Sequence, residues 1–384
     1  MQEKRVSVRR AATTALALAA AVLQFTGCTT VAAGKVPTAR EAPTVRYFLY
    51  AANSNENTIS AYLVDESTGA LTPVTGSPFA AGAKPAGVAA DSARRLLYVV
   101  NSGSDSVSTY AIDAGTGALV GANALPLATG SAPEEIAVDP TGSLLCVTNY
   151  GSNTVSVWAV GPGTGARTAL SGSPFPAGSN PAGVAADPAG KYIYVANNGS
   201  NDISTYAVTA RGAAQTAVRG HAAEAGAYPS GIAVDPTGRF VYVTNNGSGT
   251  ISAYTISQGS GALTPTRGSP FPAGSSPWGV AIDPTGKLAY VANASSGTVS
   301  GYRIDALSGG LRAVNGSPFP AASSPRGIVV DPTGRFVYAA SYGGNSVCAY
   351  SIDTSSGALS AVSGSPFAAG SRPTGVAIAA VAGP

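Results

Sequence analysis

Residues 235–256 read DPTGRFVYVTNNGSGTISAYTI, a tight turn followed by two short apolar runs. The same pattern recurs every 48 residues, and the residue that closes the first run marks it: Asn53, Asn101, Asn149, Asn197, Asn245 and Asn293, with Ser341 in the seventh copy. No insertion or deletion changes this spacing. A fixed period of roughly 20 to 50 residues is typical of solenoids, repeat arrays and propellers, so the repeat decides the fold class.

Each 48-residue unit contains four short strands separated by turn residues. The first strand, such as GIAVD at 231–235, is apolar on both faces, as expected for the innermost strand of a blade that neighbouring blades cover. The second and third strands fall at 240–245 and 250–256, and a weak fourth strand forms the outer edge. We therefore predict an all-β, seven-bladed β-propeller of four-stranded antiparallel blades over residues 46–384.

The two ends of the repeat region complete one blade between them. The region starts with a second strand, residues 47–53, and ends with an unpaired first strand, residues 375–379. Pairing of the C-terminal strand with the N-terminal blade closes the ring and leaves no inner edge exposed. Seven complete blades result.

A carboxylate and large aromatic rings also recur once in most units. The turn after the first strand has Asp, Pro and Gly at its first, second and fourth corners, which favours a type I turn. The recurring carboxylates are Asp91, Asp139, Asp187, Asp235, Asp283 and Asp331. We predict that they hold turns and are not catalytic, and that the aromatic columns pack between twisted blades.

The YVVN, YVAN and YVTN runs, each after a DPTG-type turn, resemble the YVTN β-propeller repeat and the wider lactonase-like seven-bladed propeller family. The resemblance covers residues 46–380. The family includes 6-phosphogluconolactonases and muconate-lactonizing relatives, together with many secreted and surface propellers without an established reaction. Membership of a fold does not by itself establish an activity.

Residues 1–27 have the layout of a secretory signal peptide. A basic stretch precedes an Ala- and Leu-rich run that is too short for a membrane span. Small residues before Cys28 resemble a bacterial lipobox, although Phe25 stands where Leu is usual. We predict lipidation of Cys28 and a tether over residues 28–45 that reaches roughly 50 Å when extended. Ordinary signal-peptidase cleavage is the alternative.

The charge balance argues against nucleic acid as a partner. The chain has 22 basic and 19 acidic residues, and removing the four basic residues and one acidic residue of the signal leaves 18 of each. Only 11% of residues are charged. A neutral domain lacks the basic surface that phosphate-backbone binding requires. Cys146 and Cys348 lie in blades far apart around the ring, so we expect buried thiols without a disulfide.

Two slots at one end of the ring differ from blade to blade. The slot after the Pro that leads into the first strand holds Ala86, Glu134, Ala182, Ser230, Trp278, Arg326 and Thr374, and the slot after the Asn column holds Ser54, Ser102, Tyr150, Asn198, Asn246, Ala294 and Tyr342. We predict that five of these residues converge around the channel mouth: Glu134, Tyr150, Trp278, Arg326 and Tyr342. Such a set suits a small polar ligand such as a sugar. The alternative is a solvated rim with a surface ion pair between Glu134 and Arg326.

Glu135 replaces a Gly that the other six copies share. Because adjacent strand residues point to opposite faces, Glu134 and Glu135 are not expected to act as a pair, and at most one should face the channel. An acid at the mouth would polarise or deprotonate a water molecule. The alternative is a hydrogen-bonded replacement in a divergent blade.

The remaining inventory of reactive side chains is small. The only histidine, His221, lies in a segment that departs from the repeat, so we expect it on an inter-blade loop, where it supplies neither a metal cluster nor a nucleophile dyad. The family resemblance implies that basic residues and histidines near the channel handle a phosphosugar, and only Arg326 matches that role here.

We therefore predict an exported, monomeric propeller at the bacterial cell envelope, periplasmic or on the surface, that contacts the membrane only through its lipid anchor. It would bind a small polar ligand or an envelope protein and need no cofactor or metal. The alternative is a hydrolase of sugar lactones that uses Glu134, Glu135 and Arg326.

Overall fold

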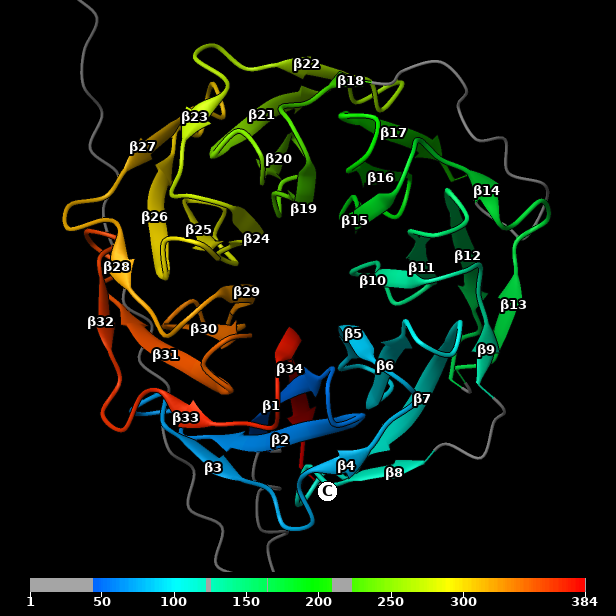
Figure 1. Cartoon of the computed structure of the whole chain (residues 1–384), viewed down its shortest axis with the longest axis vertical. Helices are drawn as coiled ribbons and strands as arrows, with labels where there is room; N and C mark the ends of the chain where they lie inside the picture. The colour runs from blue at the N-terminus through cyan, green and yellow to red at the C-terminus, as the bar shows by residue number, and fades with distance from the viewer. Residues whose placement is uncertain (1–43, 122–125, 164, 209–222, 384) are drawn as a thin grey trace, which may run out of the picture. The chain divides into compact units, whose positions relative to one another are not determined.

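The structure, a computed structural model, describes residues 44–121, 126–163, 165–208 and 223–383. Within these ranges every regular element is a β-strand, and the strands form seven antiparallel sheets arranged as blades around a central channel (Figure 1). The seven-bladed propeller predicted from the repeat is confirmed. No described segment forms a helix with the length and apolar character needed to cross a membrane.

The first strand of each repeat is the innermost strand of its blade, as predicted. From blade one to blade seven, the inner strands are β34 (Pro373–Ala382), β5 (Pro85–Asp91), β10 (Pro133–Val138), β15 (Pro181–Ala186), β19 (Pro229–Val234), β24 (Pro277–Ile282) and β29 (Pro325–Val330). The second strands are β1 (Val45–Asn53), β6 (Leu96–Asn101), β11 (Leu144–Asn149), β16 (Tyr192–Asn197), β20 (Phe240–Asn245), β25 (Leu288–Asn293) and β30 (Phe336–Ser341). These second strands are almost wholly buried because a neighbouring blade covers each face.

Two short strands pair with the outer edge of most third strands. The third strands are β2 (Thr58–Val64), β7 (Ser106–Ile112), β12 (Thr154–Val160), β17 (Asp202–Ala207), β21 (Thr250–Ile256), β26 (Thr298–Ile304) and β31 (Ser346–Ile352). The outer strands are β3 (Leu71–Pro73), β8 (Leu119–Gly121), β13 (Arg167–Ala169), β22 (Leu263–Pro265), β27 (Leu311–Ala313) and β32 (Leu359–Ala361). A second set comprises β4 (Phe79–Ala80), β9 (Leu127–Ala128), β14 (Phe175–Pro176), β18 (Ala223–Glu224), β23 (Phe271–Pro272), β28 (Phe319–Pro320) and β33 (Phe367–Ala368). Six blades therefore have five strands, one more than the sequence suggested.

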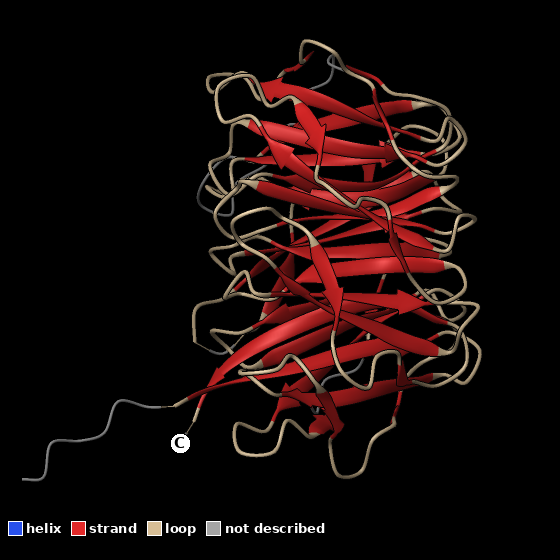
Figure 2. Cartoon of the chain, turned by 90° about the vertical axis from the view of Figure 1, so that its left-hand side faces the viewer, coloured by secondary structure: helices blue, strands red, loops and turns tan. Residues whose placement is uncertain are grey.

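The ring closes by pairing its two ends. β1 pairs with β2 on one side and with β34 on the other, in a register that places Phe48 opposite Ala379. The predicted closure is confirmed. Seen from the side, the connecting loops gather on the two faces of the ring (Figure 2). One face carries the turns after the second strands together with the starts of the inner strands, as the hydrogen bond from Tyr342 N to Ser324 O shows (2.9 Å). We call it the mouth face.

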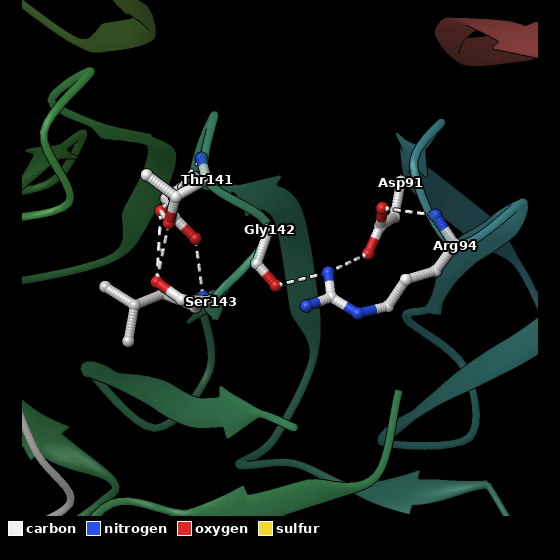
Figure 3. A network of polar contacts seen from close by, with 7 residues as sticks. Asp91, Arg94, Thr141, Gly142 and Ser143 are labelled. Carbon is white, nitrogen blue, oxygen red and sulfur yellow. Dashed lines mark hydrogen bonds and ion pairs between the residues drawn. The ribbon is translucent and has the colours of Figure 1, made fainter. Parts of the chain in front are cut away.

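The recurring Asp residues hold the turns on the opposite face. Asp235 is buried, and its carboxylate accepts backbone N–H groups of Thr237 (3.1 Å), Arg239 (2.7 Å) and Phe240 (2.7 Å). In blade two the turn reads DSAR, and the Arg94 guanidinium lies between the Asp91 carboxylate and the carbonyl of Gly142 in blade three, 2.7 Å from each (Figure 3). These carboxylates accept hydrogen bonds within their own turns, so we assign them a structural role and not a catalytic one.

Tyrosine hydroxyls connect each blade to the next at six of the seven interfaces. Two kinds of bond form at five of them, and the interface of blades three and four has one bond, from the Tyr206 hydroxyl to the Pro176 carbonyl (2.7 Å). A tyrosine of the second strand donates to a glycine carbonyl in the following blade, as in Tyr242 to Gly309 (3.0 Å). A tyrosine of the third strand donates to a carbonyl in the preceding blade, as in Tyr302 to Pro272 (2.8 Å). Both bonds form at the interfaces of blades one and two, four and five, five and six, six and seven, and seven and one.

Blade three departs from this scheme because Cys146 and Trp158 occupy its two tyrosine columns and have no hydroxyl to donate. Arginines connect it to blade two instead. Arg94 donates to the Gly142 carbonyl, and Arg167 Nη1 donates to Thr109 Oγ1 (3.0 Å). The Arg167 guanidinium also lies 5.9 Å from the ring of Tyr98, whose hydroxyl makes none of the inter-blade bonds to a glycine carbonyl.

We expect Tyr242→Phe to lower the free energy of unfolding by about 1 to 2 kcal/mol, because it removes a buried hydrogen bond between blades and leaves the Gly309 carbonyl without its donor. Urea denaturation measures this change. Tyr98→Phe is the matched control at a buried ring of the same column, and it should have a clearly smaller effect. Equal losses for the two variants would contradict the role assigned to the tyrosine hydroxyls.

Candidate active site in the central channel

The channel contains a cavity of about 200 Å³ near the mouth face. Every blade contributes the three residues that follow the Pro of its inner strand, which gives 21 lining residues. Only Glu134, Glu135 and Arg326 among them carry an ionisable side chain. The rest of the lining is small or apolar apart from Ser230 and Thr374, so the three charged groups dominate its chemistry.

A column of glycines allows the inner strands to approach one another at this level. A Cβ added to Gly279 would lie 2.5 Å from the carbonyl oxygen of Arg326 in the next blade, and one added to Gly231 would lie 2.4 Å from that of Trp278. A side chain at these positions would therefore force the blades apart. Glu135 occupies this column in blade three, and its carboxylate is accommodated beside Gly87, where a Cβ would lie 2.6 Å from Glu135 Oε1.

Both glutamates of blade three line the cavity. The expectation that at most one of their side chains faces the channel stays a prediction. The pairing register of β10 with β11 shifts between Pro133 and Ile136, as expected for a β-bulge, and the inner strands of the other six blades show a register shift as well. The negative charge of Glu134 acts on Glu135 and contributes to raising its pKa.

Hydrogen bonds fix the backbone and one carboxylate oxygen of Glu135. Its Oε1 accepts the backbone N–H of Ile136 (3.0 Å), and its own N–H donates to Thr148 Oγ1 (3.0 Å). Burial raises the pKa of Glu135 to about 7, because its effect and the repulsion from Glu134 exceed the opposing effect of the Ile136 N–H. Burial likewise raises the pKa of Glu134, against the attraction of Arg326. With a pKa of about 7, the Glu135 carboxyl is partly protonated and partly ionised at neutral pH.

Arg326 is held between two aromatic rings. Its guanidinium carbon lies 4.5 Å from the ring centroid of Trp278 and 3.6 Å from that of Tyr342. Its Nε–H is buried and has no hydrogen-bond partner among the described residues. Burial lowers the pKa of Arg326, which the Tyr342 and Glu134 charges oppose. Cation–π contacts thus position the guanidinium without using its donors.

The alternative of a surface ion pair between Glu134 and Arg326 is not what the structure contains. In the described part of the chain, the ion pair with a nitrogen–oxygen distance within 4.0 Å joins Arg94 and Asp91, and Asp91 is the last residue of β5. Glu134 and Arg326 are therefore not in direct contact as an ion pair. Glu134 and Arg326 instead line the same cavity and act on each other electrostatically. Their charges therefore remain available to a bound molecule.

The two predicted rim tyrosines are placed differently. Neither tyrosine is among the residues that line the cavity. The Tyr342 ring stacks on Arg326 and its centroid lies 5.4 Å from the guanidinium carbon of Arg372, whereas Tyr150 is 37% exposed. Arg372 was missed by the sequence reasoning. Its signal lies in a third variable slot, the residue before the Pro: Lys84, Ala132, Asn180, Tyr228, Ser276, Ser324 and Arg372.

The sequence also made predictions about the N-terminal segment, the cysteines and the histidine. The signal peptide, Cys28 and His221 lie outside the described residues. Cys146 and Cys348 are buried free thiols, as predicted. No group of three or more His, Cys, Asp or Glu side chains suited to a metal ion occurs across the described ranges.

The fold and the cavity define a seven-bladed β-propeller with a candidate active site at the centre of its ring. The family model described as "Lactonase, 7-bladed beta-propeller" matches residues 29–127, 75–179, 166–278 and 269–377. The chain therefore belongs to the lactonase family of seven-bladed β-propellers. This membership corrects the leading sequence-based hypothesis of a ligand-binding or protein-interaction module, and favours the alternative of a lactone hydrolase.

Solved structures share the fold at low sequence identity. A candidate 6-phosphogluconolactonase from Bacteroides uniformis is similar with a TM-score of 0.74 and 21% identity, over 87% of this chain and 99% of that chain. One from Bacteroides fragilis gives 0.74 and 20%, over 89% and 99%. The periplasmic gluconolactonase of Pseudomonas aeruginosa gives 0.70 and 19%, over 88% and 99%. Comparison with curated proteins gives no match.

The raised pKa of Glu135 makes a prediction about stability. Because the folded pKa of about 7 lies above the unfolded value near roughly 4.3, the stabilisation from proton binding is fully present below the unfolded pKa and is lost as the pH rises through about 7. Glu135→Gln cannot ionise, so its free energy of unfolding relative to the unmodified protein should increase between pH 5 and pH 8.

Urea denaturation at the two pH values tests this expectation. Glu66→Gln, at an exposed position on blade one, is the control and should show no comparable pH-dependent gain. A constant difference between Glu135→Gln and the unmodified protein at both pH values would contradict the assigned pKa.

Proposed function

We propose that this protein hydrolyses a sugar lactone in its channel cavity. The observation that carries the proposal is the placement of the carboxyl pair Glu134 and Glu135 and the guanidinium of Arg326 in one cavity of about 200 Å³. Lactone hydrolysis needs a base for water and a positive group for the carbonyl oxygen, and this cavity supplies both. Membership of the lactonase family supports the same reaction.

Glu135 is the proposed general base. A carboxylate with a pKa near 7 is ionised in a useful fraction at neutral pH and is basic enough to take a proton from water. The Ile136 N–H binds Oε1, so Oε2 is the oxygen available for the water. Protonated Glu135 then returns the proton to the ring oxygen of the lactone as that oxygen leaves.

Arg326 is the proposed electrophile. Arg326 lines the cavity, where its terminal N–H groups would donate to the lactone carbonyl oxygen. The rings of Trp278 and Tyr342 hold the guanidinium in place. A fixed donor that faces a developing oxyanion in a site of low dielectric constant stabilises the transition state strongly.

Glu134 is the proposed modulator of this pair. Its negative charge contributes to the raised pKa of Glu135 and attracts Arg326. Because the rate depends on ionised Glu135, kcat/KM should rise as the pH rises through about 7. Glu134→Gln removes one negative charge and should move the midpoint of this rise to lower pH.

Incubation with D-glucono-1,5-lactone and its 6-phosphate, with acid release followed by a pH indicator, tests the proposal after spontaneous hydrolysis is subtracted. We expect Glu135→Gln to lower kcat by roughly 100- to 10,000-fold and Arg326→Gln by roughly 100- to 1,000-fold. Glu66→Gln is the matched control and should retain full activity. Turnover that survives Glu135→Gln, or no turnover of either lactone, would exclude this mechanism.

For the cellular setting we infer an exported lipoprotein, from the signal-like residues 1–27 and the small residues before Cys28. Diacylation of Cys28 would hold the propeller at the envelope through the segment up to residue 45. Cys28→Ser should release the protein from the membrane fraction to the soluble fraction, measured by immunoblot after ultracentrifugation. An unchanged distribution would exclude lipidation and favour ordinary signal cleavage.

A further inference from the structure

We infer that Arg326, Tyr342 and Arg372 form an anion-binding subsite at the channel mouth that takes the carboxylate of the ring-opened product. This inference rests on the proposed lactone hydrolysis for the identity of the anion. The site itself rests on the geometry of three side chains from blades seven and one. We call these three side chains the Arg–Tyr–Arg stack.

One aromatic ring lies against both guanidinium groups. The guanidinium carbon of Arg326 lies 3.6 Å from the ring centroid of Tyr342, and that of Arg372 lies 5.4 Å from it. Arg372 Nη1 also donates to the Tyr342 hydroxyl at 3.4 Å. Tyr342 thereby positions a part-buried cation that lines the cavity next to an exposed cation at the rim.

The positive charges of the stack are not neutralised within the described residues. Among the described residues, no carboxylate oxygen lies within 4.0 Å of a guanidinium nitrogen of Arg326 or Arg372. The ion pair that meets this distance joins Arg94 and Asp91, which are not part of the stack. The buried Nε–H of Arg326 lacks a hydrogen-bond partner as well. The positive charges of Arg326 and Arg372 repel each other, and a small oxyanion bound at the stack would offset this repulsion while accepting charge-assisted hydrogen bonds.

The proposed reaction creates such an anion inside the cavity. The water oxygen forms a bond to the carbonyl carbon, the bond from that carbon to the ring oxygen breaks, and the ring oxygen takes a proton and becomes a hydroxyl group. The resulting carboxylic acid loses a proton to solvent at neutral pH. No oxidant or reductant is required.

In the proposed reaction, the new carboxylate forms between groups that repel it and groups that attract it. Glu134 and Glu135 repel it, whereas Arg326 already contacts the oxygen that becomes part of it in the proposed mechanism. Arg372 is the adjacent cation and is exposed at the rim. The carboxylate is therefore drawn from the carboxyl pair toward the stack and from there to solvent. A phosphate on a substrate is the other oxyanion that the stack could hold, but the carboxylate forms beside Arg326.

Binding of sodium D-gluconate, measured without turnover, tests this subsite. The chain has two tryptophans, and Trp158→Phe leaves Trp278, 4.5 Å from the Arg326 guanidinium, as a fluorescent reporter. Titrations use gluconate, the uncharged polyol D-glucitol and inorganic phosphate at constant ionic strength. Isothermal titration calorimetry of the chain with both tryptophans repeats the measurement, in case Trp158→Phe disturbs the fold.

We expect gluconate to bind more tightly than D-glucitol, and Arg372→Gln to weaken gluconate binding by about tenfold at low salt, as for loss of one charge-assisted hydrogen bond. Arg372→Lys should restore part of the affinity. Arg267→Gln removes the same charge at an exposed outer turn of blade five and should leave the affinity unchanged.

Gluconate affinity that is unchanged in Arg372→Gln would overturn the subsite. Tighter binding of inorganic phosphate than of gluconate, with the same dependence on Arg372, would overturn the assignment to a carboxylate. Absence of lactone turnover together with gluconate binding that depends on Arg372 would refute the hydrolysis and leave the anion site standing. Turnover together with binding that is independent of Arg372 would refute only the subsite.

Discussion

The pairing of β1 with β34 is the constraint on which the rest of the molecule depends. It joins the two ends of the repeat region into one blade and makes the ring continuous, with no open inner edge. Continuity fixes the distance between the seven inner strands. Their glycine column, in which an added Cβ would reach the carbonyl of the next blade, then sets how closely they approach. The size of the central cavity follows from these two conditions.

The candidate site lies where single residues depart from the pattern that the seven repeats share. A ring brings equivalent positions of all seven repeats to one centre, so a single unusual residue in one blade faces an unusual residue in another. Glu135 fills a glycine position, and the empty space beside Gly87 accommodates its carboxylate. Arg326 comes from a blade more than 190 residues later in the chain, yet both side chains line one cavity.

The fold could be predicted from the sequence because its signals are local and repeated. Turn residues such as those after Asp235 recur at one spacing, and the half-blades at the two ends can pair in only one way. The site could be predicted in part, since Glu134, Trp278 and Arg326 were found by comparing one slot across blades. The place of the Glu135 carboxylate beside Gly87 depends on how β10 packs against blade two, which the pattern of the repeat does not contain. Arg372 was missed because its role depends on side-chain reach across Tyr342.

The hydrogen bonds of Arg94 and Arg167 make the interface of blades two and three different from the interfaces that tyrosine hydroxyls connect. Tyrosine side chains are rigid, and a phenol hydroxyl loses its hydrogen bond after a small displacement. The stems of Arg94 and Arg167 have more rotatable bonds than a tyrosine side chain, and their guanidinium groups bond to Gly142 and Thr109. The ring is thus closed by strand pairing, and the side-chain connection between blades two and three is made by arginines. That interface adjoins the blade that carries Glu134 and Glu135.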